Sequence, residues 1–196
     1  MESDYLNKKY FNITDLIQTE FDRNVSKYGD KIKCSKGCSK CCSQIFKITQ
    51  IDAIIIADYL NKLSNENKTR LKEKAIIYLN ELSVQFPKEN NSLDEYSVKS
   101  KLPCPALNGV GECMIYEARP VICRRFGPPV YDYKNPEKLF ACELNFKDGE
   151  EIIDDLLIPL QTEIGMMWDD LKRIFNEEYD EKKIASTTIA EAILKS

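Results

Sequence analysis

The sequence predicts a mainly α protein in which helices flank irregular, cysteine-rich metal-binding loops, with little strand. Four segments carry apolar residues at the three- and four-residue spacing of an amphipathic helix. Two regions between them, 31–47 and 103–142, show no sustained period and contain all eight cysteines. Irregular segments that gather this many thiols indicate that metal ligation replaces the missing backbone ladders.

The first predicted helix covers residues 12–28. Asn12 is its predicted N-cap, with Asp15 three residues later, and Gly29 is a typical helix stop. The apolar residues of this segment recur on one face: Ile13, Leu16, Ile17, Phe21, Val25 and Tyr28.

Two more helices are predicted between the cysteine regions, over 49–63 and 67–86. Thr49 is the predicted N-cap of the first, with Asp52 at the third helical position as in a capping box. Because the connection is short, we expect an antiparallel hairpin that returns the chain toward the first cysteines. The apolar positions are Ile51, Ile54, Ile55, Tyr59 and Leu63, then Leu71, Ala75, Leu79, Leu82 and Phe86.

The last predicted helix covers 150–178, and Pro159 is expected to kink or split it. Trp168, Met166 and Met167 are expected to fill the core or a groove. The apolar stripe of this segment consists of Ile153, Leu156, Leu157, Leu160, Ile164, Met167, Trp168, Leu171 and Phe175.

Only short elements are predicted elsewhere. Residues 43–49, with the sequence SQIFKIT, are the best candidate for a strand. Pro120, which follows Arg119, is predicted to begin a short helical turn. That turn would present Cys123 and end at Gly127.

A chain of 196 residues can bury one proper core. We predict a single domain over 1–196, with a cysteine-cluster metal-binding core at about 31–142 and N-terminal and C-terminal helices packed on it. The N-terminus lacks the apolar stretch of a signal peptide, and the most apolar run, 51–60, is too short to span a bilayer. We therefore expect a cytoplasmic protein that binds no membrane. A net charge of −4 without a basic face argues against nucleic-acid binding.

The cysteines are the candidate functional residues. In a reducing cytosol, this many cysteines favour metal ligation over a disulfide framework. The chain contains no histidine, which excludes Cys–His and Ser–His–Asp catalysis and every two-histidine metal site. A soft-metal site in this chain is therefore thiolate-rich. The predicted metal ligands are Cys34, Cys38, Cys41, Cys42, Cys104, Cys113, Cys123 and Cys142.

Cationic side chains accompany both groups of cysteines. They lower the pKa of neighbouring thiols and offset the charge of a thiolate–metal site, although a solvated basic patch is an equal alternative for the lysines. Arg119 is expected to donate hydrogen bonds to loop carbonyls or thiolates. Tyr116 and Phe126 are expected to form an apolar wall of the site. The cations are Lys31, Lys33, Lys36, Lys40, Lys47, Arg119, Arg124 and Arg125.

Cys41 and Cys42 are adjacent, and in a helical turn their side chains diverge by about 100°. One of them can therefore serve a second ion, bridge two ions or stay outside the site. The later cysteines are spread along 103–142 and are poorly suited to nucleate a site alone. The economical arrangement folds 103–142 back onto 34–42, so that both groups contribute to one metal-bearing core.

Cys34, Cys38 and Cys41 also have the C-x3-C-x2-C spacing with which radical S-adenosylmethionine enzymes hold a four-iron cluster. That class is not favoured, because its barrel of alternating strands and helices differs from the helical pattern that follows the motif here. The spacing still shows that a four-iron cluster is compatible with these cysteines.

Together the motifs resemble the CxxCxxCC family of bacterial and archaeal proteins labelled zinc- or iron-chelating. They are CSKGCSKCC (34–42), PCPAL (103–107), GECMIYEARPVICRRF (111–126) and Cys142. All eight cysteines lie on the family pattern, as do Arg119, Pro120, Arg124 and Phe126. The resemblance covers roughly 34–142 and implies chelation of zinc or iron. Flagellin lysine methylases are similar over the same cysteines and imply an iron–sulfur cluster, but they are considerably longer.

The sequence names no catalytic base, and the glycines of 108–112 match neither a P-loop nor a dinucleotide-binding loop. We therefore predict a non-enzymatic metal-binding protein that holds zinc or iron, either mononuclear or in an iron–sulfur cluster. The alternatives are an iron–sulfur-dependent enzyme related to flagellin lysine N-methylases and an interaction module with structural zinc. Thiolate sites suit zinc and iron alike, so the metal stays open, and no protein partner is identified.

Overall fold

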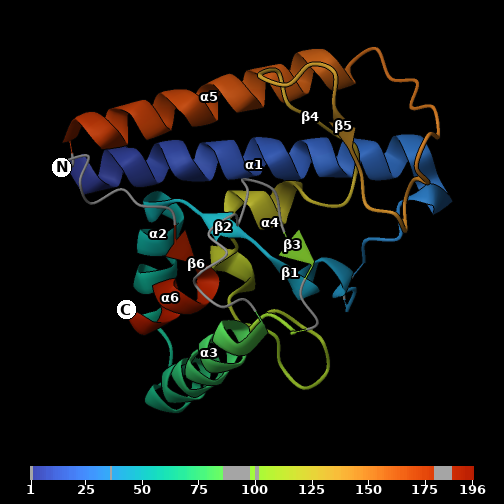
Figure 1. Cartoon of the computed structure of the whole chain (residues 1–196). Coiled ribbons are helices and arrows are strands. Elements are labelled where there is room, and N and C mark those ends of the chain that lie inside the picture. Colours follow the sequence, from blue (N-terminus) through green and yellow to red (C-terminus); the bar gives the residue numbers. More distant parts are fainter. Residues whose placement is uncertain (1, 36, 86–97, 100–101, 179–186) are drawn as a thin grey trace. The chain divides into compact units, whose positions relative to one another are not determined.

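The computed structural model describes residues 2–35, 37–85, 98–99, 102–178 and 187–196 (Figure 1). Helices dominate these residues, which confirms the prediction of a mainly α chain with little strand. The helices are α1 (Glu2–Tyr28), α2 (Gln50–Leu60), α3 (Asn65–Gln85), α4 (Val121–Arg125), α5 (Leu157–Glu178) and α6 (Ile189–Leu194). The strands are β1 (Gln44–Ile45), β2 (Lys47–Ile48), β3 (Val98–Lys99), β4 (Val130–Tyr131), β5 (Leu139–Phe140) and β6 (Thr187–Thr188). Three short 3-10 helices are η1 (Gly29–Lys31), η2 (Lys40–Ser43) and η3 (Tyr116–Ala118).

The chain divides into two compact units. Unit 1 consists of Met1–Ser35 and Arg124–Lys183, and unit 2 consists of Lys36–Cys123 and Ile184–Ser196. This division does not test whether the chain folds as one domain. The single domain over 1–196, with its core at about 31–142, stays a prediction.

Helices α1 and α5 run antiparallel to each other and form the body of unit 1 (Figure 1). Near the start of α1, the ring of Tyr10 meets that of Trp168 edge-on, with the centroids 6.0 Å apart. Near its end, Arg23 Nη2 lies 2.6 Å from Asp154 Oδ2, just before α5. Each helix buries one apolar stripe, as its periodicity predicts. The buried residues include Ile13, Ile17, Ile164, Leu171 and Phe175.

Helix α1 begins ten residues before the predicted start at Asn12, so the prediction of Asn12 as N-cap was wrong. The physical reason is that the buried stripe continues toward the N-terminus through Tyr10 and Leu6. Burial of these side chains stabilises the longer helix more than a single capping hydrogen bond can. The stop at Gly29 is confirmed: the helix ends at Tyr28, and Gly29 takes a φ of +51°, which glycine adopts without strain.

Helix α5 begins at Leu157 rather than at 150, so Pro159 neither kinks nor splits it. Pro159 lies in the first turn, where a backbone N–H has no helical partner and proline is tolerated. The residues before α5 are not helical, and Ile153 and Leu156 are exposed rather than part of a buried stripe. Asp154 anchors this segment instead, because its carboxylate pairs with Arg23.

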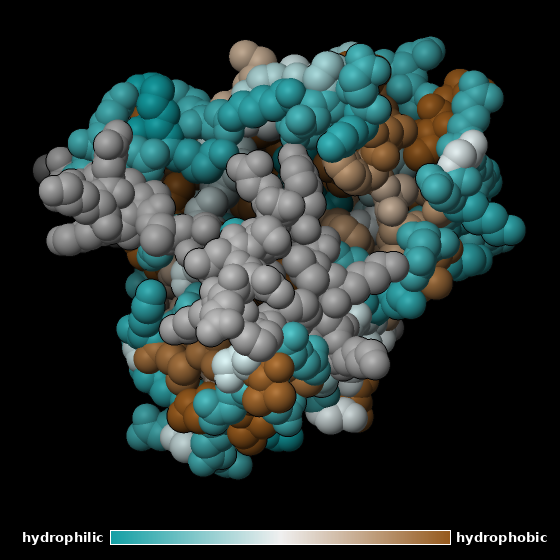
Figure 2. All heavy atoms as spheres, in the orientation of Figure 1, coloured by the Kyte–Doolittle hydropathy of each residue, from teal (hydrophilic) through white to brown (hydrophobic). Residues whose placement is uncertain are grey.

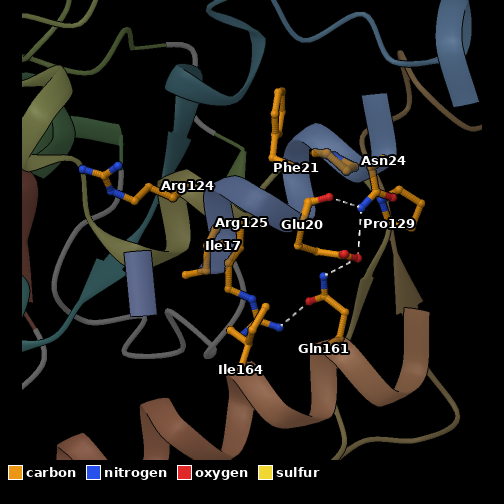
Figure 3. A pocket seen from close by; sticks show the side chains of 10 residues that line it. Ile17, Glu20, Phe21, Asn24, Arg124, Arg125, Pro129, Gln161 and Ile164 are labelled. Atoms are coloured by element: carbon orange, nitrogen blue, oxygen red, sulfur yellow. Dashed lines mark hydrogen bonds between the residues drawn. The ribbon is translucent and has the colours of Figure 1, made fainter. Parts of the chain in front are cut away.

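A network of polar side chains is buried between the helices of unit 1 (Figure 3). The Glu20 carboxylate accepts hydrogen bonds from Arg23 at 2.5 and 2.8 Å, from Asn24 at 3.0 Å and from Gln161 at 3.4 Å. Gln161 in turn accepts from Arg125 at 3.0 Å. The cavity beside these groups measures about 10 Å³, room for one water. The network is therefore a packing feature and not a substrate site.

In unit 2, the predicted capping box of α2 is confirmed. The Thr49 hydroxyl accepts from the backbone N–H of Asp52, and the Asp52 carboxylate accepts from the backbone N–H of Thr49. In α3 fewer positions are buried than predicted. Leu71 and Ala75 are buried as predicted, and Tyr78, which was not predicted, is buried with them. Phe86, the last predicted position of that stripe, lies outside the described residues. The buried residues of these helices are Ile51, Asp52, Ile55, Ile56, Leu60, Leu71, Ala75 and Tyr78.

The segment 43–49 forms two short strands that pair with different partners. Strand β1 pairs antiparallel with β3, and β2 pairs antiparallel with β6 near the end of the chain. Sequence analysis assigned no element to 187–196, because a two-residue strand has no periodicity to detect. Thr188 caps α6 through a second capping box with Glu191. Within the described elements, α2 and α3 each pack more extensively on α6 than on each other.

The outer surface carries scattered apolar side chains. Figure 2 shows hydrophilic atoms over most of the coloured surface of one face, with hydrophobic atoms exposed in places. On α3, Ile76, Ile77 and Val84 are exposed. Scattered apolar residues are common on protein surfaces and identify no partner. No helix within the described ranges has both the length and the hydrophobicity needed to cross a membrane.

Candidate metal centre

The eight predicted ligands divide between the two units. Unit 1 contains Cys34 and Cys142, and unit 2 contains the rest: Cys38, Cys41, Cys42, Cys104, Cys113 and Cys123. Unit 2 therefore holds members of both sequence groups. Whether the two groups share one metal-bearing core stays a prediction.

The 3-10 helix η2 positions Cys41 and Cys42 in a single turn. Gly37 precedes it with a φ of +88°, a left-handed backbone that glycine adopts without strain. The backbone N–H of Cys104 donates to the carbonyl oxygen of Cys42 at 2.7 Å. This hydrogen bond joins the start of the later cysteine group to the end of the earlier one.

A tight loop holds Cys104 and Cys113 near each other. Leu107 forms an antiparallel bridge with Cys113, and the backbone N–H of Met114 donates to the Ala106 carbonyl oxygen at 2.7 Å. The Asn108 side chain closes the turn by accepting from the backbone N–H of Glu112 at 2.8 Å. Asparagine favours such turns because its side chain bonds the backbone a few residues away. The glycines of 108–112 therefore serve a structural turn.

Asp52 positions the helix that carries Cys123. Its carboxylate is 2% exposed and accepts from the Thr49 hydroxyl at 2.8 Å and from the Val121 backbone N–H at 3.0 Å. One buried side chain thus ties the start of α2 to the start of α4, which begins just after Pro120 as predicted. The predicted end is also confirmed, since Gly127 has a φ of +132° two residues after α4.

We expect Asp52→Asn to lower the free energy of unfolding by about 1–3 kcal/mol. The NH₂ of the asparagine would face a backbone N–H that now donates to the carboxylate, so that hydrogen bond would be lost. Denaturant unfolding followed by circular dichroism measures this change. Asp58→Asn is the matched control, since Asp58 is an exposed residue on the same helix. Equal stability losses in the two variants would refute the anchoring role of Asp52.

Four thiols of unit 2 influence one another electrostatically. Burial raises the pKa of Cys123 well above its ordinary value, and its interactions with Cys104, Cys41 and Cys113 raise it further. Burial also raises the pKa of Cys104 to about 12, with contributions from Cys113 and Cys41. The pKa of Cys41 is raised first by its hydrogen bond with Cys42 and then by burial. Without metal, Cys41, Cys104 and Cys123 are therefore thiols at neutral pH.

The side chain of Arg119 lies close enough to affect the thiol of Cys41. The Arg119 guanidinium stacks on the ring of Tyr116, 3.7 Å from its centroid, and its Nε donates to the Tyr116 carbonyl oxygen at 3.3 Å. Its charge lowers the pKa of Cys41 in part. This confirms the expected bond from Arg119 to a loop carbonyl. Tyr116 itself is 53% exposed, so its prediction as an apolar wall was wrong.

Sequence analysis missed Lys74 and Tyr78, which α3 brings to Cys104. Burial lowers the pKa of Lys74, while Cys104 acts to raise it. Burial and then Cys104 raise the pKa of Tyr78 to about 12. One signal in the sequence could have pointed to Lys74. It lies directly before Ala75, beside the apolar stripe of its helix, where a charged residue is unusual.

Two of the other predicted cations contact groups that are not thiols. Arg125 donates to the Tyr131 carbonyl oxygen at 3.3 Å and to Gln161 within unit 1. The Lys31 ammonium pairs with Glu150. Lys36 lies outside the described residues.

In unit 1, Cys34 and Cys142 lie around the backbone of Gly127. The N–H of Cys142 donates to the Gly127 carbonyl oxygen at 2.9 Å. A Cβ added to Gly127 would come within 2.6 Å of Cys34 Sγ, so glycine leaves room for this sulfur. Asn145 completes the arrangement by donating from Nδ2 to Cys34 Sγ at 3.4 Å.

The donor set fits a soft metal by its chemistry. Thiolates are preferred ligands of zinc and of iron in sulfur-rich sites. Among the residues that the structure describes, no group of three Cys, Asp or Glu side chains already stands in ligand geometry.

The chain was compared with known proteins. No curated protein and no solved structure matches it. A family model matches residues 33–142, more than half of the chain, and includes every cysteine. Its description is "putative zinc- or iron-chelating domain". On this match, the chain belongs to the CxxCxxCC family.

Proposed function

We propose that this protein binds zinc or iron through a four-thiolate centre in unit 2, formed by Cys41, Cys104, Cys113 and Cys123. The observation that carries the proposal is the hydrogen bond from the Cys104 N–H to the Cys42 carbonyl oxygen, which ties the loop of Cys104 and Cys113 to η2. The effect of Cys41, Cys104 and Cys113 on the pKa of Cys123, on α4, supports the same grouping. Short loops that carry partly buried cysteines are typical of structural metal sites. Cys34, Cys38, Cys42 and Cys142 stay candidate ligands.

The local charges support this centre. Four thiolates around one divalent ion leave a net negative charge, which nearby cations offset. Arg119 and Lys74 are placed to do so, because each already interacts with one of the thiols. A four-thiolate set also suits a four-iron cluster, and the iron–sulfur form is part of the proposal.

We infer a binding role rather than catalysis. The carboxylate of Asp52, which raises the pKa of Cys123, is committed to hydrogen bonds with Thr49 and Val121. It is therefore poorly suited to act as a general base. A reducing cytoplasm is the compartment that we propose, because it keeps such thiols available to a metal.

Metal analysis of protein purified without oxygen tests the proposal. Zinc or iron at about one equivalent per chain or more is expected, and an iron–sulfur cluster would add absorbance in the visible region. A folded, fully reduced protein that retains no metal and takes up neither zinc nor ferrous iron would contradict the proposal.

Metal binding is expected to release protons. The thiol of Cys104 has a pKa of about 12 without metal, so a metal ion must displace its proton at neutral pH. Affinity should therefore rise with pH, with about one proton released per thiol bound. Calorimetric titration in buffers of different ionisation enthalpy counts these protons. Binding without proton release would show that the bound groups are not these thiols.

Without metal, the stability of the protein should change in the opposite direction with pH. The pKa of Cys104 is raised from 9.0 in the fold, so the folded state binds its proton more tightly than the unfolded chain. Its contribution to stability is present below pH 9.0 and is lost as the pH rises toward about 12. Denaturant unfolding of the metal-free protein at increasing pH measures this loss.

A further inference from the structure

The side chain of Asn145 is held in a single orientation within unit 1. It is 6% exposed, and its Oδ1 accepts from the backbone N–H of Lys33 at 2.9 Å. Its Nδ2 donates to the Gly127 carbonyl oxygen at 2.7 Å. Reversing the amide would place a donor against the N–H and an acceptor against the carbonyl. The observed orientation is therefore the one that the backbone requires.

This orientation aims the second hydrogen of Nδ2 at a sulfur. Nδ2 lies 3.4 Å from Cys34 Sγ. A sulfur is a weak acceptor as a thiol and a stronger one as a thiolate, because a hydrogen bond to a charged acceptor is about twice as strong. The contact therefore fixes the position of the Cys34 sulfur.

Neighbouring contacts keep both partners in place. The backbone N–H of Asn145 donates to the Cys142 carbonyl oxygen at 2.8 Å. The next residue, Phe146, is buried and meets the ring of Tyr28 edge-on, with the centroids 5.1 Å apart. At Gly127 a side chain would displace the Cys34 sulfur, as its 2.6 Å approach shows. The donor and the acceptor are thus preorganised before any metal arrives.

We propose that Asn145 is a positioning residue that holds the Cys34 sulfur and donates a hydrogen bond to its metal-bound thiolate. This inference rests on the proposed function and takes Cys34, a candidate ligand there, as one of the thiolates that bind zinc or iron. Hydrogen bonds to metal-bound sulfurs orient the ligand and withdraw charge from it, and losing such a partner typically costs 10–100-fold in affinity. Asn145 lies outside the matched residues 33–142, so the family motif does not include it.

The hydrogen bond itself is tested on metal-free, full-length protein. The side-chain NH₂ resonances of Asn145 are assigned by NMR and compared between wild type and Cys34→Ala. One of the two Nδ2 protons should shift in the variant, while the side-chain resonances of Asn24 stay in place. Unchanged Asn145 protons would overturn the inference. This measurement needs no metal, so it decides the hydrogen bond even where the proposed function fails.

The positioning role is tested by metal release. Zinc-loaded Asn145→Ala should lose zinc to a chelator about tenfold faster than wild type, in the phase that depends on Cys34. The matched control is Asn24→Ala, which removes another buried amide of unit 1 that also bonds a backbone carbonyl but touches no cysteine. The role would be overturned if Asn145→Ala released zinc at the wild-type rate, or if both variants released it equally faster than wild type.

A second variant disturbs the same contact from the side of Gly127. Gly127→Ala leaves the Asn145 amide in place but puts a methyl group where Cys34 Sγ lies, on a backbone with a φ of +132° that a side chain strains. It should accelerate zinc release and shift the same Nδ2 proton. No shift of that proton would overturn the proposed geometry. Wild-type chain that takes up no zinc would instead refute the proposed function.

Discussion

Replacing Cys123 with serine should weaken zinc binding by roughly a hundredfold. One ligand of four accounts for about a quarter of the 10–16 kcal/mol typical of structural zinc, on the order of 3 kcal/mol. Serine keeps the size of cysteine, but its hydroxyl does not ionise at neutral pH. Cys123 is a suitable position because it interacts with all three other thiols of the proposed centre. Competition with a chromophoric chelator measures the affinity.

Cys38→Ser provides the matched control for this experiment. It makes the same substitution in the same unit, but Cys38 is exposed and lies outside the proposed four. Its effect on affinity should therefore be much smaller. Equal losses in the two variants would show that the centre uses a different set of sulfurs. Unchanged affinity in Cys123→Ser would exclude the proposed centre.

Replacing Glu20 with alanine should lower the free energy of unfolding by about 3 kcal/mol. Glu20 is 5% exposed and accepts hydrogen bonds from Arg23, Asn24 and Gln161. Removing one partner of a buried ion pair typically costs 3–5 kcal/mol. The low end applies here because Arg23 keeps Asp154 as a partner at 2.6 Å. Trp168, the single tryptophan of the chain, reports unfolding of unit 1 by fluorescence.

Glu163→Ala is the control for Glu20→Ala. Glu163 is exposed on α5, so its replacement should change stability by no more than about 0.5 kcal/mol. A Glu20→Ala protein as stable as this control would mean that the buried network contributes no net stability. Zinc affinity serves as a second readout, since the proposed centre lies in unit 2 and Glu20 lies in unit 1.

Local signals in the sequence predicted the helices well. The α2 capping box, from Thr49 to Asp52, and the stop at Gly29 were both confirmed. Each depends on residues within one turn of each other, so the sequence alone contains the interaction. The start of α1 was misplaced because burial of Leu6 and Tyr10 outweighs the capping signal at Asn12.

Hydrophobic periodicity could not predict the interactions between segments that are distant in the sequence. The pairing of β2 with β6 joins residues 47–48 to 187–188, and neither strand is long enough to show a pattern. The second role of Asp52 depends on Val121, which is far away in the sequence. Lys74 reaches Cys104 only because α3 folds against the cysteine loops within unit 2.

The sequence by itself determined the chemistry of this protein. Eight cysteines without a histidine restrict any soft-metal site to thiolates, and the order of the motifs places the chain in its family. Only the tertiary structure decided which cysteines become neighbours. In unit 2, Cys41, Cys104 and Cys113 lie near enough to Cys123 to raise its pKa, whereas Cys34 lies in unit 1 beside Asn145. Residue type sets what a group can bind, but its neighbours are set by long-range hydrogen bonds and burial, which no local pattern records.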